Sequence, residues 1–213
     1  MRDLFESQEG EALPLAPGAV VLRDFALSSA PALLADVQRV TAKAPWRHLV
    51  TPGGFRMSVA MTNCGALGWV SDRTGYRYDA IDPLTGAPWP AMPASFLQMA
   101  HDAAAAAGYD GFVPDACLVN RYEPGARLSL HQDRDEHDYG APIVSVSLGL
   151  PAVFLFGGAA RSDKTRRVSL VHGDVVVWGG ASRLHHHGVL PLADGDHPAT
   201  GRCRINLTFR KAG

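Results

Sequence analysis

The tripeptide His131-Gln132-Asp133 places an imidazole and a carboxylate two residues apart. Alternate side chains of an extended segment point to the same face, so His131 and Asp133 can chelate one metal ion. The run His185-His186-His187 offers a third ligand, with His185 and His187 on one strand face and His186 on the other. Two imidazoles and one carboxylate that leave the other metal positions open are typical of non-haem Fe(II) oxygenases.

This metal pattern has competing interpretations. The spacing does not separate His185 from His187 as the third ligand, the histidine run could be a polar strand end, and Zn(II) hydrolases use similar ligands. A second pair, His172-Gly173-Asp174, directly precedes the apolar run Val175–Trp178. We interpret that second pair as a turn that enters a buried strand.

The closing run 204–210, Arg-Ile-Asn-Leu-Thr-Phe-Arg, alternates polar and apolar residues without a break. As a strand it turns the apolar residues toward the core and gathers two guanidinium groups, an amide and a hydroxyl on its other face. That face is either exposed to water or binds an anion. Because a guanidinium grips a carboxylate through two parallel hydrogen bonds, two arginines suit a dicarboxylate. Asn120 and Tyr122 alternate onto one face and could donate to the same ligand, although Tyr122 could instead be a core residue.

The elements that must position these side chains change along the chain. Helices are expected from Ser29 to about Lys43 and from Pro93 to Ala107, where Gly108 can act as the C-terminal cap. Residues 45–90 are rich in glycine and aromatic residues and are expected to be irregular rather than part of the core. From Cys117 onward, short β-type runs predict a sandwich or barrel of antiparallel sheets. These runs are Cys117–Tyr122, Ile143–Leu148, Val153–Phe156, Arg167–Leu170, Val175–Trp178, Leu184–Gly188 and Arg202–Arg210.

The composition is that of an ordinary folded protein, with 213 residues, 46% hydrophobic and 19% charged. Twenty basic and 21 acidic side chains give no overall basic field for long duplex nucleic acid, although a local basic patch would be enough for a short contact. Three widely spaced cysteines indicate neither a disulfide framework nor a thiolate zinc site. No apolar run is long enough to span a membrane or to export the chain, so we expect a cytoplasmic, soluble protein.

Taken together, the motifs resemble those of the AlkB family of 2-oxoglutarate- and Fe(II)-dependent dioxygenases, and they do so over nearly the whole chain. The segments that carry the resemblance are Met57–Gly65, Asn120–Tyr122, Leu130–Asp133, Asp174–Gly180, His187–Gly188 and Arg204–Arg210. The resemblance implies a mostly β, α+β chain with a double-stranded β-helix (jelly-roll) core. It also implies one domain, with an N-terminal extension (1–44), a nucleotide-recognition lid (45–90) and a catalytic core (91–213).

The resemblance assigns roles to particular residues. It implies iron held by His131, Asp133 and His187, because the distal ligand directly precedes Gly188, whereas the histidines at 185 and 186 depart from an expected aromatic pair. The implied 2-oxoglutarate site comprises Asn120, Arg121, Tyr122, Arg204, Asn206 and Arg210. The implied substrate contacts are Trp69, Tyr76, Arg77, Tyr78, Asp135 and Arg161.

The implied reaction is the oxidative demethylation of N-alkylated bases in DNA, preferably single-stranded, and RNA is a further expected substrate. It couples 2-oxoglutarate and O2 to succinate, CO2 and formaldehyde. Duplex DNA would require the base to be flipped out of the stack, and no obligate protein partner is indicated. The alternatives are a 2-oxoglutarate oxygenase that acts on protein or on a small metabolite, and a damaged-base binder without turnover.

Overall fold

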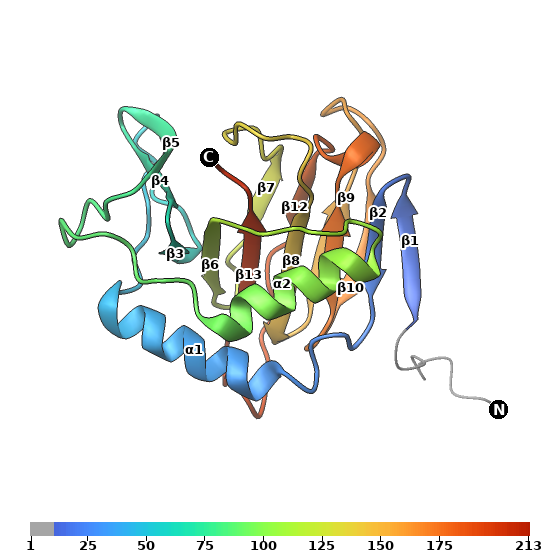
Figure 1. Cartoon of the computed structure of the whole chain (residues 1–213), viewed down its shortest axis with the longest axis horizontal. Helices are drawn as coiled ribbons and strands as arrows, with labels where there is room; N and C mark the ends of the chain where they lie inside the picture. The colour runs from blue at the N-terminus through green and yellow to red at the C-terminus, as the bar shows by residue number, and fades with distance from the viewer. Residues whose placement is uncertain (1–10) are drawn as a thin grey trace.

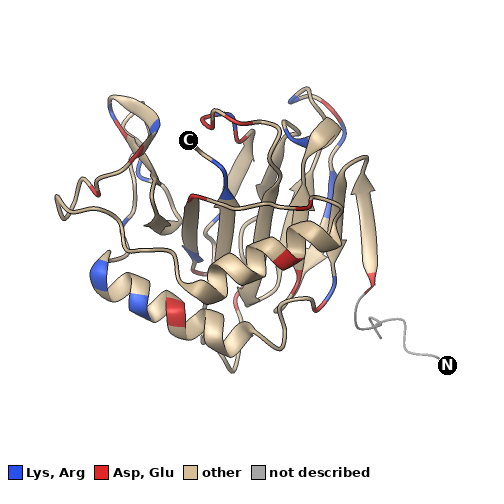
Figure 2. Ribbon diagram, viewed as in Figure 1, with Lys and Arg blue, Asp and Glu red and all other residues tan. Residues whose placement is uncertain are grey.

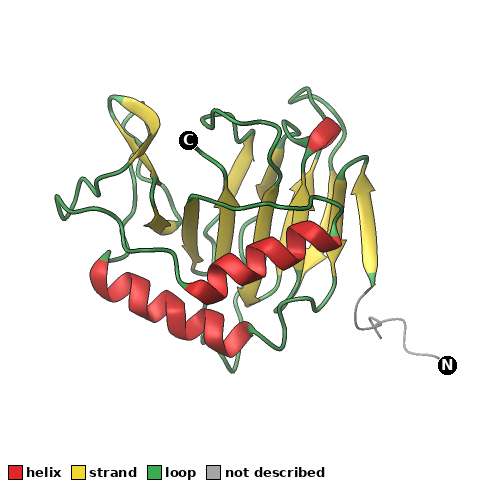
Figure 3. Ribbon diagram, viewed as in Figure 1, coloured by secondary structure: helices red, strands yellow, loops and turns green. Residues whose placement is uncertain are grey.

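Two antiparallel sheets form most of the molecule in a computed structural model, which describes residues 11–213 (Figures 1 and 3). The seven-stranded sheet has the order β1 (Ala12–Ala16), β2 (Ala19–Leu22), β11 (Val175–Trp178), β8 (Ile143–Gly149), β13 (Arg204–Arg210), β6 (Ala116–Tyr122) and β3 (Ala60–Gly65). The four-stranded sheet has the order β10 (Arg166–Leu170), β9 (Ala152–Phe156), β12 (His187–Val189) and β7 (Leu128–His131). A separate hairpin consists of β4 (Gly68–Asp72) and β5 (Gly75–Asp79), and a short 3-10 helix, η1, spans Gly180–Ser182.

Two helices, α1 (Ala30–Lys43) and α2 (Ala94–Ala106), cover one face of the seven-stranded sheet (Figure 1). Their apolar residues join one core with the alternate residues of β6, β8 and β13. In that core the rings of Phe96 and Phe209 meet edge to face, with centroids 5.8 Å apart. The helix predictions are confirmed, and Gly108, with φ +85°, follows α2 at the expected end. No helix among residues 11–213 has the length and apolar character to cross a membrane.

A second core fills the space between the two sheets. Ile143 and Trp178 from the larger sheet belong to one cluster with Phe154, Phe156 and Leu170 from the smaller sheet. The inner strands of the larger sheet therefore contribute one face to the helices and the other to the interior of the sandwich. This arrangement confirms the predicted mostly β fold with a jelly-roll core.

Several boundaries differ from the sequence predictions. The segment 45–90 is not free of core elements, because β3 pairs with β6 along its whole length and closes one edge of the main sheet. The N-terminal strands β1 and β2, which were not predicted, extend the opposite edge through β11. The run that begins at Leu184 becomes a strand only at His187, and the final strand begins at Arg204 rather than at Arg202.

Candidate active site

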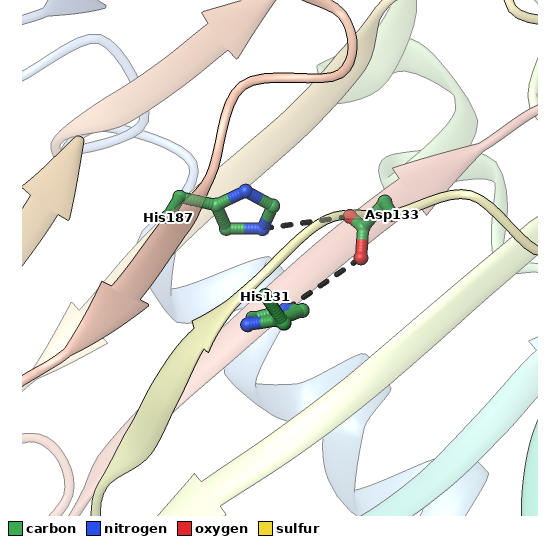
Figure 4. A group of neighbouring side chains, drawn as sticks. All are labelled: His131, Asp133 and His187. Carbon is green, nitrogen blue, oxygen red and sulfur yellow. Dashed lines mark ion pairs between the residues drawn. The ribbon is translucent and has the colours of Figure 1, made fainter. Parts of the chain in front are cut away.

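His131, Asp133 and His187 come together between the two sheets (Figure 4). One ligand atom from each lies within 4.8 Å of the others, a separation that one metal ion can bridge. The Asp133 carboxylate lies beside both rings, with Oδ1 3.6 Å from His131 Nε2 and Oδ2 3.7 Å from His187 Nε2. The triad is His2Asp with no thiolate, which is the donor set of non-haem Fe(II) oxygenases.

Strand pairing brings the two histidines together. His131 ends β7 and His187 begins β12, and the two residues are register partners across the antiparallel pair. Gly188 permits this approach, because a Cβ there would lie 2.7 Å from the carbonyl oxygen of Leu128. The strands could not come so close with any other residue at position 188.

Local hydrogen bonds orient both imidazoles toward the Asp133 carboxylate. His131 Nδ1 lies 2.8 Å from the carbonyl oxygen of Ser129, and His187 Nδ1 lies 3.1 Å from that of His185. Each Nδ1–H therefore donates to backbone, and the Nε2 lone pair faces the third ligand. Burial and the neighbouring His131 imidazole lower the pKa of His187 to about 3, so this ring is neutral and able to coordinate a cation at pH 7.

The other histidines of the run lie elsewhere. The His185 ring packs 5.6 Å from that of Phe156, outside the triad, whereas His186 lines the adjoining cavity. His172 accepts a hydrogen bond from the Gly149 amide, and the buried Asp174 carboxylate accepts bonds from Val171 and Arg23. The interpretation of His172-Gly173-Asp174 as a strand-entry turn is therefore confirmed.

The polar face of β13 points into the sandwich, not to water. Every residue from Arg204 to Arg210 is buried, and Ile205, Leu207 and Phe209 belong to the helix-side core. Four polar side chains consequently line a cavity of about 900 Å³ beside the triad, a volume typical of small-ligand sites: Arg204, Asn206, Thr208 and Arg210. Burial rules out the exposed-face alternative.

The two arginines of this strand have different surroundings. Arg210 donates through Nε and Nη2 to Asp133 Oδ2, at 3.0 and 2.8 Å. Burial alone would raise the pKa of Asp133, but Arg210 and the two histidines outweigh it and hold the pKa well below its usual range. Asp133 is therefore ionised at neutral pH and could serve as an anionic ligand.

Arg204 is 2% exposed and donates through Nη2 to Ser147 Oγ at 2.9 Å. Its guanidinium carbon lies 5.1 Å from the centre of the Tyr122 ring. Nε and Nη1 of Arg204 find no acceptor among residues 11–213, and Asn120 Oδ1 likewise has no partner there. A buried, unpaired guanidinium is costly without an anion, so the residues fit a carboxylate ligand.

The side-chain amide of Asn206, next to Arg204 on the polar face of β13, is held in place by hydrogen bonds. Asn206 donates through Nδ2 to Ser145 Oγ and to the carbonyl oxygen of Val146, and its Oδ1 accepts from Thr208. Ser145 and Ser147 were not singled out from the sequence, although they alternate with Val144, Val146 and Leu148 in the same way as the polar residues of β13. This alternation could have predicted that Ser145 and Ser147 lie beside the polar face of β13.

The structure places most predicted substrate residues at the mouth of the same cavity: Trp69, Tyr76, Asp135 and Arg161 line it. The Trp69 and Tyr76 rings are stacked, with centroids 5.6 Å apart and planes 14° from parallel. Trp69 Nε1 donates to Asp135 Oδ2 at 2.8 Å, which joins the β4–β5 hairpin to the loop beyond the triad.

Three predicted site residues, Arg77, Tyr78 and Arg121, do not line the cavity. Arg121 lies between Asn120 and Tyr122, so strand alternation turns it to the other side of β6, where it pairs with Glu123 at 3.2 Å. Arg77 is turned away from the mouth in the same way and pairs with Asp72 and Asp79. Tyr78 is buried, and its hydroxyl donates to Glu136 Oε1 at 2.6 Å.

Comparison with known proteins agrees with this geometry. Residues 18–210 match the model of the 2OG-Fe(II) oxygenase superfamily. The chain belongs to this superfamily. This oxygenase is 62% identical over 212 residues to the alpha-ketoglutarate-dependent dioxygenase AlkB of Salmonella typhimurium, covering 100% of the chain and 98% of that protein. It is 61% identical to the AlkB of Escherichia coli, covering 100% of the chain and 99% of that protein.

Solved structures support the same assignment. The structure of OsALKBH1 superposes with a TM-score of 0.83 at 30% identity, covering 94% of this chain and 100% of that one. The chain is thus an Fe(II)- and 2-oxoglutarate-dependent dioxygenase that uses O2. Its His2Asp triad and unpaired Arg204 fit the metal and the acidic cosubstrate.

Proposed function

We propose that this dioxygenase oxidatively demethylates N-alkylated bases in DNA, with a preference for single strands. The observation that carries the proposal is the shared cavity, in which an aromatic pair and a carboxylate stand at the mouth above the His2Asp triad. The names of its relatives support it, since they are AlkB dioxygenases and nucleic acid dioxygenases such as ALKBH1 of Mus musculus.

The mouth is suited to a cationic base. Adenine methylated at N1 and cytosine methylated at N3 carry a positive charge at neutral pH, and the stacked Trp69 and Tyr76 rings can attract such a base through stacking and cation–π contact. Asp135 adds a negative charge beside Trp69. An unmodified, neutral base gains less from both contacts, so we propose that these three residues select the lesion.

We propose that the lid comprises the β4–β5 hairpin and the loop before β3, within residues 45–90. Basic residues surround the opening, namely Arg56, Arg127, Arg134 and Arg161. Elsewhere Lys and Arg are interspersed with Asp and Glu along the chain (Figure 2). Such a local basic rim suits a short stretch of flexible strand, which needs no unpairing before its base enters the cavity.

The protein's own groups would prepare the reaction by position and charge. His131, Asp133 and His187 would hold Fe(II). Arg204 would pair with the distal carboxylate of 2-oxoglutarate. The rest of that molecule would contact Asn120, Tyr122 and Arg210. The chemistry supplied by bound Fe(II), 2-oxoglutarate and O2 is oxidation of the N-methyl group, which leaves as formaldehyde while 2-oxoglutarate is converted to succinate and CO2. A base seated at the mouth would present its methyl group to the triad below it.

The test compares substrates in one succinate assay. Protein loaded anaerobically with Fe(II) and 2-oxoglutarate receives O2 together with a single-stranded oligonucleotide that contains one N1-methyladenine. The matched controls are the unmethylated strand, the methylated strand in a duplex, and the same lesion in RNA. We expect succinate and formaldehyde from the methylated single strand, and less from the duplex.

Other outcomes would favour the alternatives. Binding of the methylated strand without succinate would indicate a damaged-base binder. Succinate formation that no oligonucleotide stimulates would indicate a protein or small-metabolite oxygenase.

A further inference from the structure

A buried carboxylate, Glu136, lies beside the triad and has no part in the chemistry above. It is 4% exposed and belongs to the loop that follows Asp133. Its Oε1 accepts from the Tyr78 hydroxyl at 2.6 Å and lies 3.4 Å from Arg210 Nε. Its Oε2 accepts from Arg183 Nη2 at 3.2 Å. Three donors from three separate segments of the chain therefore converge on one side chain.

Both arginines that contact Glu136 also hold the metal carboxylate residue. Arg210 donates twice to Asp133 Oδ2, and Arg183 Nη1 donates to the Asp133 backbone carbonyl at 2.8 Å. Arg183 and Arg210 are themselves buried. Arg183 and Arg210 therefore each connect Glu136 to Asp133. The negative charge of Glu136 helps to balance these two buried guanidinium groups.

The third donor, Tyr78, comes from the proposed lid. Tyr78 lies in β5 directly opposite Trp69 in β4, whose indole donates to Asp135. Burial raises the pKa of Tyr78 well above its ordinary value, so its hydroxyl remains a donor at neutral pH. The β4–β5 hairpin is therefore hydrogen-bonded to two consecutive acidic residues. Trp69 donates to Asp135 at the cavity mouth, and Tyr78 donates to the buried Glu136.

We infer that Glu136 is a positioning residue. It couples the position of the lid, through Tyr78, to the positions of Arg210 and Asp133. When a cation takes up the charge of Asp133 and a carboxylate ligand competes for Arg210, Glu136 remains as the fixed partner of that guanidinium. A lid closed through Tyr78 holds Glu136 in place, so nucleotide and 2-oxoglutarate should each strengthen the binding of the other by the same factor. This inference rests on the proposed function.

The test measures binding without turnover. Protein is loaded with Mn(II) under nitrogen, and its affinity for a fluorescent single strand that contains one N1-methyladenine is measured by anisotropy with and without 2-oxoglutarate. For the wild type we expect 2-oxoglutarate to tighten oligonucleotide binding about tenfold, within the usual range for coupled sites. Tyr78→Phe removes only the hydroxyl, and Glu136→Gln removes the charge that faces both arginines. We expect the effect of 2-oxoglutarate to fall to roughly twofold or less in each variant.

Tyr109→Phe is the matched control, because it deletes another tyrosine hydroxyl bond, the 2.7 Å bond to the Gly18 carbonyl, outside the cavity. It should retain the wild-type coupling. Thermal unfolding of each variant verifies folding, and Tyr78→Phe alone is sufficient should Glu136→Gln not fold. A coupling factor near one in the wild type, or an unchanged factor in Tyr78→Phe, would overturn the inference while leaving demethylation intact. Failure of the wild type to prefer the methylated strand would overturn the proposed function and the inference with it.

Discussion

Replacement of Arg204 by methionine should weaken 2-oxoglutarate binding by two to four orders of magnitude. Methionine keeps the length and apolar packing of the side chain but removes the guanidinium. Two N–H positions of Arg204, Nε and Nη1, lack an acceptor among the described residues and are free to bind a carboxylate. Two charge-assisted bonds at roughly 1.5–3 kcal/mol each give about 3–6 kcal/mol. At about 1.4 kcal/mol per tenfold change, this corresponds to about 100- to 10,000-fold.

The assay is isothermal titration of 2-oxoglutarate into protein loaded with Mn(II) under nitrogen. Arg204→Lys serves as the graded control, because an ammonium keeps the charge but cannot form the two-pronged bond, so a loss between those of wild type and methionine is expected. Folding provides a second readout. The ligand-free wild type buries an unpaired guanidinium, and therefore Arg204→Met should unfold at an equal or higher urea concentration. A 2-oxoglutarate affinity within threefold of wild type would refute this reasoning.

Three further outcomes concern the triad. His131→Ala and Asp133→Ala should abolish turnover and lose bound iron. Asp133→Ala should also lower the free energy of unfolding by about 1–3 kcal/mol, because Arg210 loses its two bonds to the carboxylate and keeps only the 3.4 Å contact with Glu136. Iron content should fall in His187→Ala and persist in His185→Ala; the reverse result would reassign the ligand. Below pH 6.5 the stability of iron-free protein should decrease, because unfolding lets His187 take up a proton that burial and His131 exclude down to about pH 3. Urea unfolding at pH 6.5 and 4.5 should differ by about 2 kcal/mol from this residue, and His187→Gln should remove that component.

Sequence periodicity predicted the features that depend on local alternation. The β13 run 204–210 was found as a strand with its polar face toward the cavity, and Asn120 and Tyr122 share the matching face of β6. Alternation also explains why Arg121 does not join them. The same rule applied to β5 separates Tyr76, at the cavity mouth, from Arg77.

Features that depend on distant contacts could not be predicted in this way. Strand β3 contains Thr62 and Asn63, whose side chains bond to Ala44 and Trp69, and its regularity comes from pairing with β6. The choice of His187 over His185 depends on the register between β12 and β7. The contacts of Glu136 join segments 47 to 74 residues apart, which leave no periodic signal in the sequence.

We propose that one cavity joins an iron and 2-oxoglutarate site to a mouth for a methylated base. The most direct test is the amount of formaldehyde released for each succinate formed on a single-stranded oligonucleotide that contains one N1-methyladenine. We expect a ratio near one and restored adenine in the strand. Succinate that accumulates at the rate of the unmethylated control, without formaldehyde, would contradict it.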